Sequence, residues 1–136
     1  MSVQQTLAYG RVVTTTLSQE EATDLAKSEL MNEGFGVLCE IDVANTLKEK
    51  IGAEVPAYRI LGACNPNFAH QALQHESQLG LLLPCNVVVQ QIAGETTVSA
   101  IDARALLGIV KNDELLTVAD DVNARLGRVL DRIAER

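Results

Sequence analysis

The alternation of apolar and polar residues along the chain predicts five β-strands. The clearest case is the sequence FGVLCEI, which places four residues on one face of a strand: Phe35, Val37, Cys39 and Ile41. The short segment Ala-Gly-Glu at residues 93–95 separates two further apolar runs and predicts a hairpin turn. The predicted strands cover residues 9–17, 35–41, 57–64, 85–92 and 96–102.

Apolar residues spaced three and four apart predict four helices between and after these strands. The first begins after Ser18, which forms a capping box with Glu21. The second is the short segment VANTLKEKI, and the third follows Asn65 as its N-cap, with Pro66 in the first turn. The longest is predicted from Glu114 to Ala134, because its apolar residues form a continuous stripe. This stripe must be covered, either by packing on the sheet, which is the default, or in part by a dimer contact.

The order of these elements favours an α+β fold. Strict alternation of strands and helices would indicate a parallel sheet, but the closing hairpin and the two short helices favour an antiparallel one. We therefore expect a mainly antiparallel five-stranded sheet with a long C-terminal helix packed on it. The chain has no linker and no low-complexity segment, so residues 1–136 are predicted to form one domain. The pattern of residues 103–111 favours no particular element.

Composition and charge exclude several classes of partner. The net charge is −7, and the eleven Lys and Arg residues are scattered, whereas nucleic-acid binding normally needs a basic patch. Aromatic residues make up only 3%, too few for stacking on single strands. No apolar run is long enough to span a bilayer, and the odd number of cysteines indicates reduced thiols in a cytoplasmic protein. We expect neither nucleic acid nor membrane as a partner.

Two similar segments carry the candidate chemistry, GACNPNFAH and PCNVVV. Each places a Cys-Asn pair at a strand end: Cys64 and Asn65 at the end of the third strand, and Cys85 and Asn86 at the start of the fourth. If these two strands are antiparallel, both pairs lie at the same edge of the sheet. His70, about one turn into the following helix, then lies near them. These five residues are the candidate site.

The residues of this site allow four interpretations. Both cysteines can be small buried apolar residues, with Asn65 only a helix cap. Cys64, His70 and Cys85 can form a metal site, although their spacing matches no standard zinc pattern. One thiol can act as a nucleophile with the other as resolving thiol and His70 as base, or the two can hold a small ligand. Whether the protein is an enzyme stays open.

Five segments of the chain resemble a known bacterial family, the domain of unknown function family numbered 302: GFGVLCEIDV, YRILGACNP, AHQAL, GLLLPCNVVV and VSAID. The resemblance implies a fold similar to that of the TATA-binding protein, with one strand, a helix, four antiparallel strands and a final helix, and with two short helices inserted. It also implies homo-oligomers, with a dimer as the expected form. No catalytic role carries over. The residues that fall on the family motif are Cys64, Asn65, Pro66, His70, Pro84, Cys85 and Asn86.

The leading hypothesis is therefore a small cytoplasmic homodimer that binds a small ligand or a metal at the Cys/Asn/His corner. Two other hypotheses remain. The first is an enzyme, or a sulfur or redox carrier, that uses Cys64 or Cys85. The second is a structural or interaction protein without chemistry, in which these residues only shape the corners of the fold. The sequence identifies no ligand and no cofactor.

Overall fold

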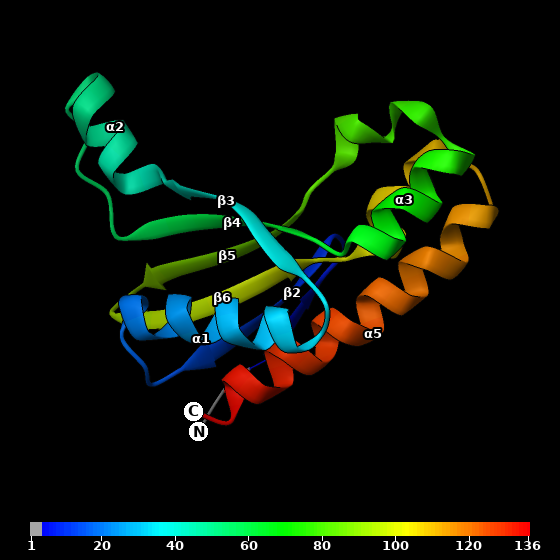
Figure 1. The fold of residues 1–136 in the computed structure, drawn as a ribbon. Helices are drawn as coiled ribbons and strands as arrows, with labels where there is room; N and C mark the ends of the chain where they lie inside the picture. The colour runs from blue at the N-terminus through cyan, green and yellow to red at the C-terminus, as the bar shows by residue number, and fades with distance from the viewer. Residues whose placement is uncertain (1–3) are drawn as a thin grey trace.

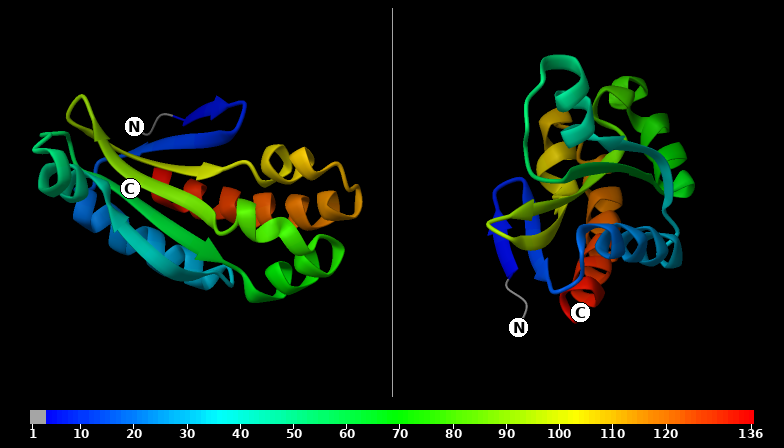
Figure 2. Two further views of the ribbon diagram at one scale, coloured as in Figure 1. Left: turned by 90° about the horizontal axis from the view of Figure 1, so that it is seen from above. Right: turned by 90° about the vertical axis from the view of Figure 1, so that its left-hand side faces the viewer.

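The computed structural model describes residues 4–136 and consists of two layers, a sheet and the helices α1 and α5 on one of its faces (Figures 1 and 2). The six-stranded sheet has the order β1-β2-β6-β5-β4-β3, and all neighbouring strands are antiparallel. The strands are β1 Gln4–Leu7, β2 Gly10–Thr15, β3 Gly36–Asp42, β4 Tyr58–Cys64, β5 Cys85–Ile92 and β6 Glu95–Ile101. The α-helices are α1 Gln19–Asn32, α2 Val43–Ile51, α3 Pro66–His75, α4 Ala103–Leu107 and α5 Glu114–Ala134.

The predicted α+β class and antiparallel sheet are confirmed, but the predicted number of five strands is wrong. The additional strand β1 is short and lies at the edge of the sheet, where it pairs only with β2. Its sequence QQTL has no apolar alternation, because an edge strand of this kind buries no face in the core. Two short 3₁₀ segments, Ser77–Leu82 and Gly108–Val110, and helix α4 also lie where the sequence predicted no element.

The core lies between the sheet and helices α1 and α5. Strands β4, β5 and β6 supply Leu61, Val87, Val89 and Val98, all fully buried. The stripe predicted for the last helix is buried along its whole length, and α5 contacts β2 and β6. The predicted packing of this helix on the sheet is therefore confirmed. The buried residues of the stripe include Leu115, Ala119, Val122, Leu126, Val129 and Ile133.

The opposite face of the sheet has no long helix over it (Figure 2). Strand pairing places Ile41, Ile60, Val88, Ser99 and Val12 in one row across five strands of this face. The neighbouring rows contain Cys39, Gly62 and Asn86 on one side and Tyr58, Gln90, Thr97 and Thr14 on the other. None of these side chains is charged. We call these three rows the open face.

Candidate functional site

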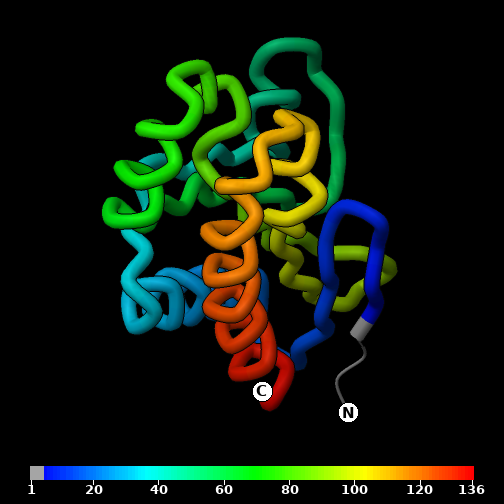
Figure 3. The backbone as a smooth tube through the Cα atoms, turned by 90° about the vertical axis from the view of Figure 1, so that its right-hand side faces the viewer, coloured from blue at the N-terminus to red at the C-terminus, as the bar shows by residue number. Residues whose placement is uncertain are grey.

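The two cysteines of the candidate site lie at the same end of the sheet. Strands β4 and β5 are antiparallel, with Ala63 directly opposite Cys85, and Cys64 is the next residue along β4. The strand direction on which the predicted site depended is therefore present. Helices α3 and α4 and the first turns of α5 gather around this end (Figure 3).

Asn65 forms the corner between β4 and α3. Its backbone is extended, with φ −96° and ψ 110°, and its Oδ1 accepts a hydrogen bond of 3.4 Å from the backbone N–H of Phe68. Pro66 occupies the first turn of the helix, where its missing N–H leaves no bond unmade. The Asn65 residue is only 8% exposed. It is thus a helix cap, as the sequence predicted, but a buried one.

A small cavity of about 40 Å³ lies behind this corner. Both thiols contribute to its wall, which is otherwise formed mainly by apolar side chains of α3, α4 and α5. Several of these are alanines, and their short side chains leave the space open. The residues that matter below are Cys64, Asn65, Phe68, Ala69, Ala72 and Cys85. Because Cys64, Phe68 and Ala69 are only half-buried, the cavity reaches the surface beside α3.

Both thiols line the same cavity, and the pKa of one of them is raised. Burial is the main cause that raises the pKa of the Cys85 thiol to about 11, and the nearby Cys64 raises it further. Cys85 is therefore a neutral thiol at physiological pH, which disfavours it as a nucleophile or an anionic ligand. All three cysteines are free, and the third, Cys39, is exposed on the open face.

The structure does not bring His70 and Asn86 into the cavity. His70 is exposed on α3, and its Nε2 lies 3.2 Å from Nε2 of Gln74. Asn86 pairs with Gly62 across the strands and is exposed on the open face. Within residues 4–136, no group of three or more His, Cys, Asp or Glu side chains is placed to hold a metal ion. The three-ligand set of Cys64, His70 and Cys85 is therefore not assembled.

Comparison with known proteins places the chain in a family. The model of the family described as "Domain of unknown function DUF302" matches residues 11–133. The chain belongs to the DUF302 family. It is also similar to the crystal structure of an uncharacterized conserved DUF302 protein from Bacillus stearothermophilus, with 31% identity and a TM-score of 0.87. That match covers 91% of this chain and 97% of the other. No curated protein matches the chain.

No helix in the described part of this DUF302 chain is both long and apolar enough to cross a membrane. The wall of the cavity contains three of the five predicted site residues, the two cysteines and Asn65. The remaining two, His70 and Asn86, lie outside the cavity.

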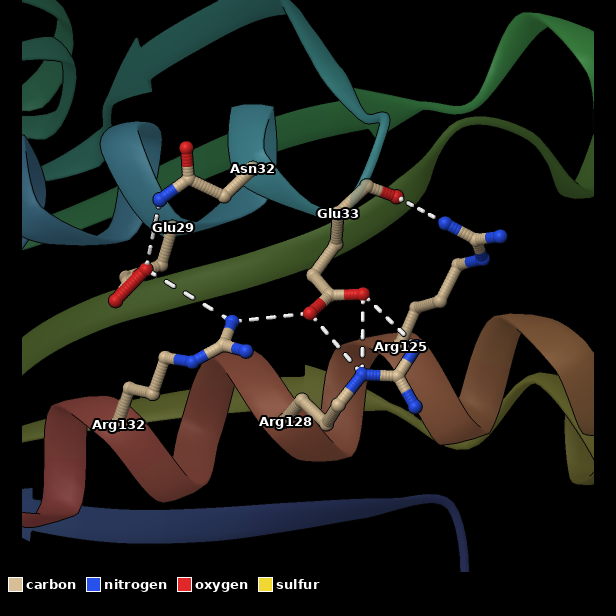
Figure 4. A network of polar contacts seen from close by, with 6 residues as sticks. All are labelled: Glu29, Asn32, Glu33, Arg125, Arg128 and Arg132. Atoms are coloured by element: carbon tan, nitrogen blue, oxygen red, sulfur yellow. Dashed lines mark hydrogen bonds and ion pairs between the residues drawn. The ribbon is translucent and has the colours of Figure 1, made fainter.

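The sequence reasoning missed a buried acidic residue next to this site, Glu33 (Figure 4). Its carboxylate accepts hydrogen bonds from Nε and Nη2 of Arg128, at 2.9 to 3.1 Å, and from Nη1 of Arg132, at 2.9 Å. The hydrogen bonds from Arg128 are the largest cause that lowers the pKa of this carboxyl, and those from Arg132 act in the same direction. The available signal was the spacing of the α5 arginines, which places them on one helix face.

A third arginine of α5 connects this ion cluster to the cavity. Nη1 of Arg125 donates a hydrogen bond of 3.0 Å to the backbone carbonyl of Glu33. The guanidinium also lies over the ring of Phe68, 5.3 Å from its centroid, in a cation–π contact. Because Phe68 lines the cavity, Arg125 holds one part of the cavity wall in place.

Proposed function

We propose that the protein is a small-ligand-binding module and that its site is the cavity between Cys64, Asn65 and Cys85. The observation that carries this proposal is the cavity itself, which is apolar, reaches the surface, and contains a few polar groups at one edge. Small-molecule sites are typically concave and mostly apolar, with a few polar groups and often a perturbed titratable group in the wall, and this cavity shares these features on a smaller scale. His70 and Asn86, outside the cavity, are expected to have no part in binding.

Two observations favour binding over thiol chemistry at Cys85. The raised pKa of Cys85 keeps this thiol protonated near neutral pH. His70, which was the candidate base, lies outside the cavity and contacts Gln74 instead. We also place the protein in the reducing cytoplasm, where three free cysteines persist.

The size of the cavity limits what enters it. An apolar cavity of about 150 Å³ can hold benzene, whereas this one measures about 40 Å³. Only a short aliphatic tip therefore fits without movement of the wall. The rest of the ligand stays at the surface beside Phe68, whose half-buried ring forms part of the opening.

An NMR titration with 1-butanol tests this proposal. We expect backbone amide shifts to change around residues 63–72 and 83–85, with little change elsewhere. The variant Ala69→Leu fills the cavity from a half-buried position and should abolish these changes. The matched control Ala124→Leu adds the same side chain at an exposed position of α5 and should keep them. Shift changes scattered over the surface would overturn the proposal. So would shift changes in the folded Ala69→Leu variant that are as large as those in the wild type.

We further propose that the protein is a homodimer that associates through the open face. A chain of net charge −7 repels its own copies, but the three rows of this face carry no charged side chain. Two copies can therefore meet there without opposing acidic groups. The row of Ile41, Ile60 and Val88 supplies apolar area for the contact.

Sedimentation velocity tests the dimer. The variant Val88→Glu places like charges at the centre of the contact and should give monomers. Gln71→Glu adds the same charge at an exposed position of α3 and should leave the dimer intact. A wild-type protein that sediments as a monomer at micromolar concentration would refute the proposal.

A further inference from the structure

The side-chain amide of the corner residue Asn65 has a hydrogen-bond partner at its oxygen but none at its nitrogen among the described residues. Its Oδ1 accepts the capping hydrogen bond from the N–H of Phe68, and this bond fixes the orientation of the amide. Its Nδ2 donates to no other group among the described residues. The residue is only 8% exposed, but Nδ2 itself is not fully buried. Nδ2 is therefore open to solvent and free to donate to an external acceptor.

Arg125 supplies an uncompensated positive charge next to this donor. Glu33 pairs with Arg128 and Arg132, and Arg132 also lies 3.9 Å from Glu29. In residues 4–136, by contrast, Arg125 pairs with no carboxylate and donates only to a backbone carbonyl. The area around Arg125 is thus locally positive on a protein that is acidic as a whole.

Gly34 is the point at which these two donors converge. A Cβ at this position would lie 3.0 Å from Nδ2 of Asn65 and 3.8 Å from Nη1 of Arg125. The backbone of Gly34 has φ +86°, which favours glycine, and a side chain at this position would crowd Nδ2 of Asn65. Two N–H donors this close to one point can reach the two oxygens of one carboxylate. Asn65 also lines the cavity, and Arg125 lies over Phe68, which lines it too.

We propose that the ligand is a carboxylic acid with a short aliphatic tail. Its carboxylate accepts hydrogen bonds from Nδ2 of Asn65 and from Arg125, and its tail passes Phe68 into the cavity beside the two thiols. This inference rests on the proposed function of the cavity and adds the chemical class of the ligand. It also gives Arg125 a role as a binding residue, besides its contact with Phe68.

A comparison of butyrate with 1-butanol, by the same NMR titration, tests the inference. The two probes share a tail and differ in the head group. We expect butyrate to bind at least about tenfold more tightly, since hydrogen bonds to a charged group are stronger than those to a neutral one. Equal affinity of the two probes would overturn the inference.

The variant Asn65→Asp isolates the free half of the amide. Aspartate keeps the helix cap, because its carboxylate still accepts from the N–H of Phe68, but it replaces the free donor with a negatively charged oxygen. We expect butyrate to lose about tenfold or more in affinity, 1-butanol to bind as before, and α3 to remain folded. Undiminished butyrate binding by the folded variant would overturn the inference.

The variant Arg125→Met removes the charge and keeps an apolar contact with Phe68. Butyrate should again lose about tenfold, while the control Lys50→Met, with the same change of net charge on α2, which does not line the cavity, should have no effect. Equal losses of butyrate affinity in the two variants would show that the loss comes from the change in net charge alone. That result would refute the proposed site. If 1-butanol enters the cavity but butyrate gains nothing, only this inference fails. If neither probe enters, the proposed function fails as well.

Discussion

Replacement of Glu33 by glutamine is the most informative perturbation of the stability of this fold. The side chain of Glu33 is 8% exposed and joins the end of α1 to the middle of α5. Glutamine keeps the shape of the side chain but removes its charge, and it turns one of the acceptors toward Arg128 and Arg132 into a donor. The variant Glu33→Gln therefore removes the ion cluster without creating a cavity.

The expected cost lies between the values for a surface and a buried ion pair. Breaking a buried pair costs about 3–5 kcal/mol, whereas a surface pair contributes about 0–1 kcal/mol. Here the carboxylate is buried, but the side chains of Arg128 and Arg132 are 50% and 41% exposed and regain hydration when they lose their partner. We therefore expect a loss of about 2 kcal/mol in the free energy of unfolding, which corresponds to about 6–10 °C in Tm for a chain of this size.

Urea denaturation at pH 7 measures this loss, with Asp120→Asn as the control. Asp120 pairs with Arg104 on the surface, where both side chains are more than half exposed, so the control should lose less than about 0.5 kcal/mol. The m-value should stay the same in both variants, because neither changes the area buried. A loss for Glu33→Gln no larger than that for the control would refute the reasoning.

The same variant tests the pH dependence. Because the folded-state pKa of Glu33 lies below its unfolded value, its contribution is present above the unfolded pKa of about 4.3 and is lost as the pH falls through the folded pKa. Glu33→Gln should therefore lose less stability than the wild type when the pH is lowered from 5 to 3. An identical acid profile for the two proteins would contradict this assignment.

Three further predictions concern single positions. Gly62→Ala places a Cβ 2.5 Å from Sγ of Cys39, so it should destabilise by about 1–3 kcal/mol, whereas Gly80→Ala, with nothing within 4 Å, should be close to neutral by thermal melting. Alkylation at pH 7.5, followed by mass spectrometry, should label exposed Cys39 rapidly and Cys85 slowly. The labelling rate of Cys85 should rise as the pH approaches 11. Fast labelling of Cys85 at pH 7.5 would restore the thiol hypothesis. Ser18→Ala removes the capping box of α1 and should cost about 1 kcal/mol by urea denaturation.

The parts of the fold that could be predicted from the sequence are those in which one face is buried. Helix α5 was predicted with the bounds Glu114–Ala134, because its stripe of apolar residues repeats over five turns. Strand β5 was likewise predicted with its observed bounds. Edge strand β1 and helix α4 were not predicted, because β1 is short and polar and α4 is a five-residue helix.

The candidate site could be predicted only in part. The Cys-Asn pairs lie at strand ends, so a prediction of strand direction was enough to place Cys64 and Cys85 together. Whether His70 faces the cavity depends on the rotation of α3 about its axis. The sequence of a single helical turn does not determine this rotation. Glu33 looked like an ordinary residue at a helix end, and its partners are about a hundred positions further along the chain. Contacts of this kind depend on the packing of α1 against α5.

The ion cluster and the proposed carboxylate site can be separated, although they share one helix. Glu33 binds Arg128 and Arg132 through its side chain but holds Arg125 through its backbone carbonyl, which glutamine retains. Glu33→Gln should therefore destabilise the protein and yet bind butyrate within about twofold of wild type at 25 °C, where it remains folded. A tenfold loss of butyrate affinity in the folded variant would show that the cluster positions Arg125 as well. Stability and ligand recognition would then depend on the same contacts, and the assignment of Arg125 as an independent binding residue would be wrong.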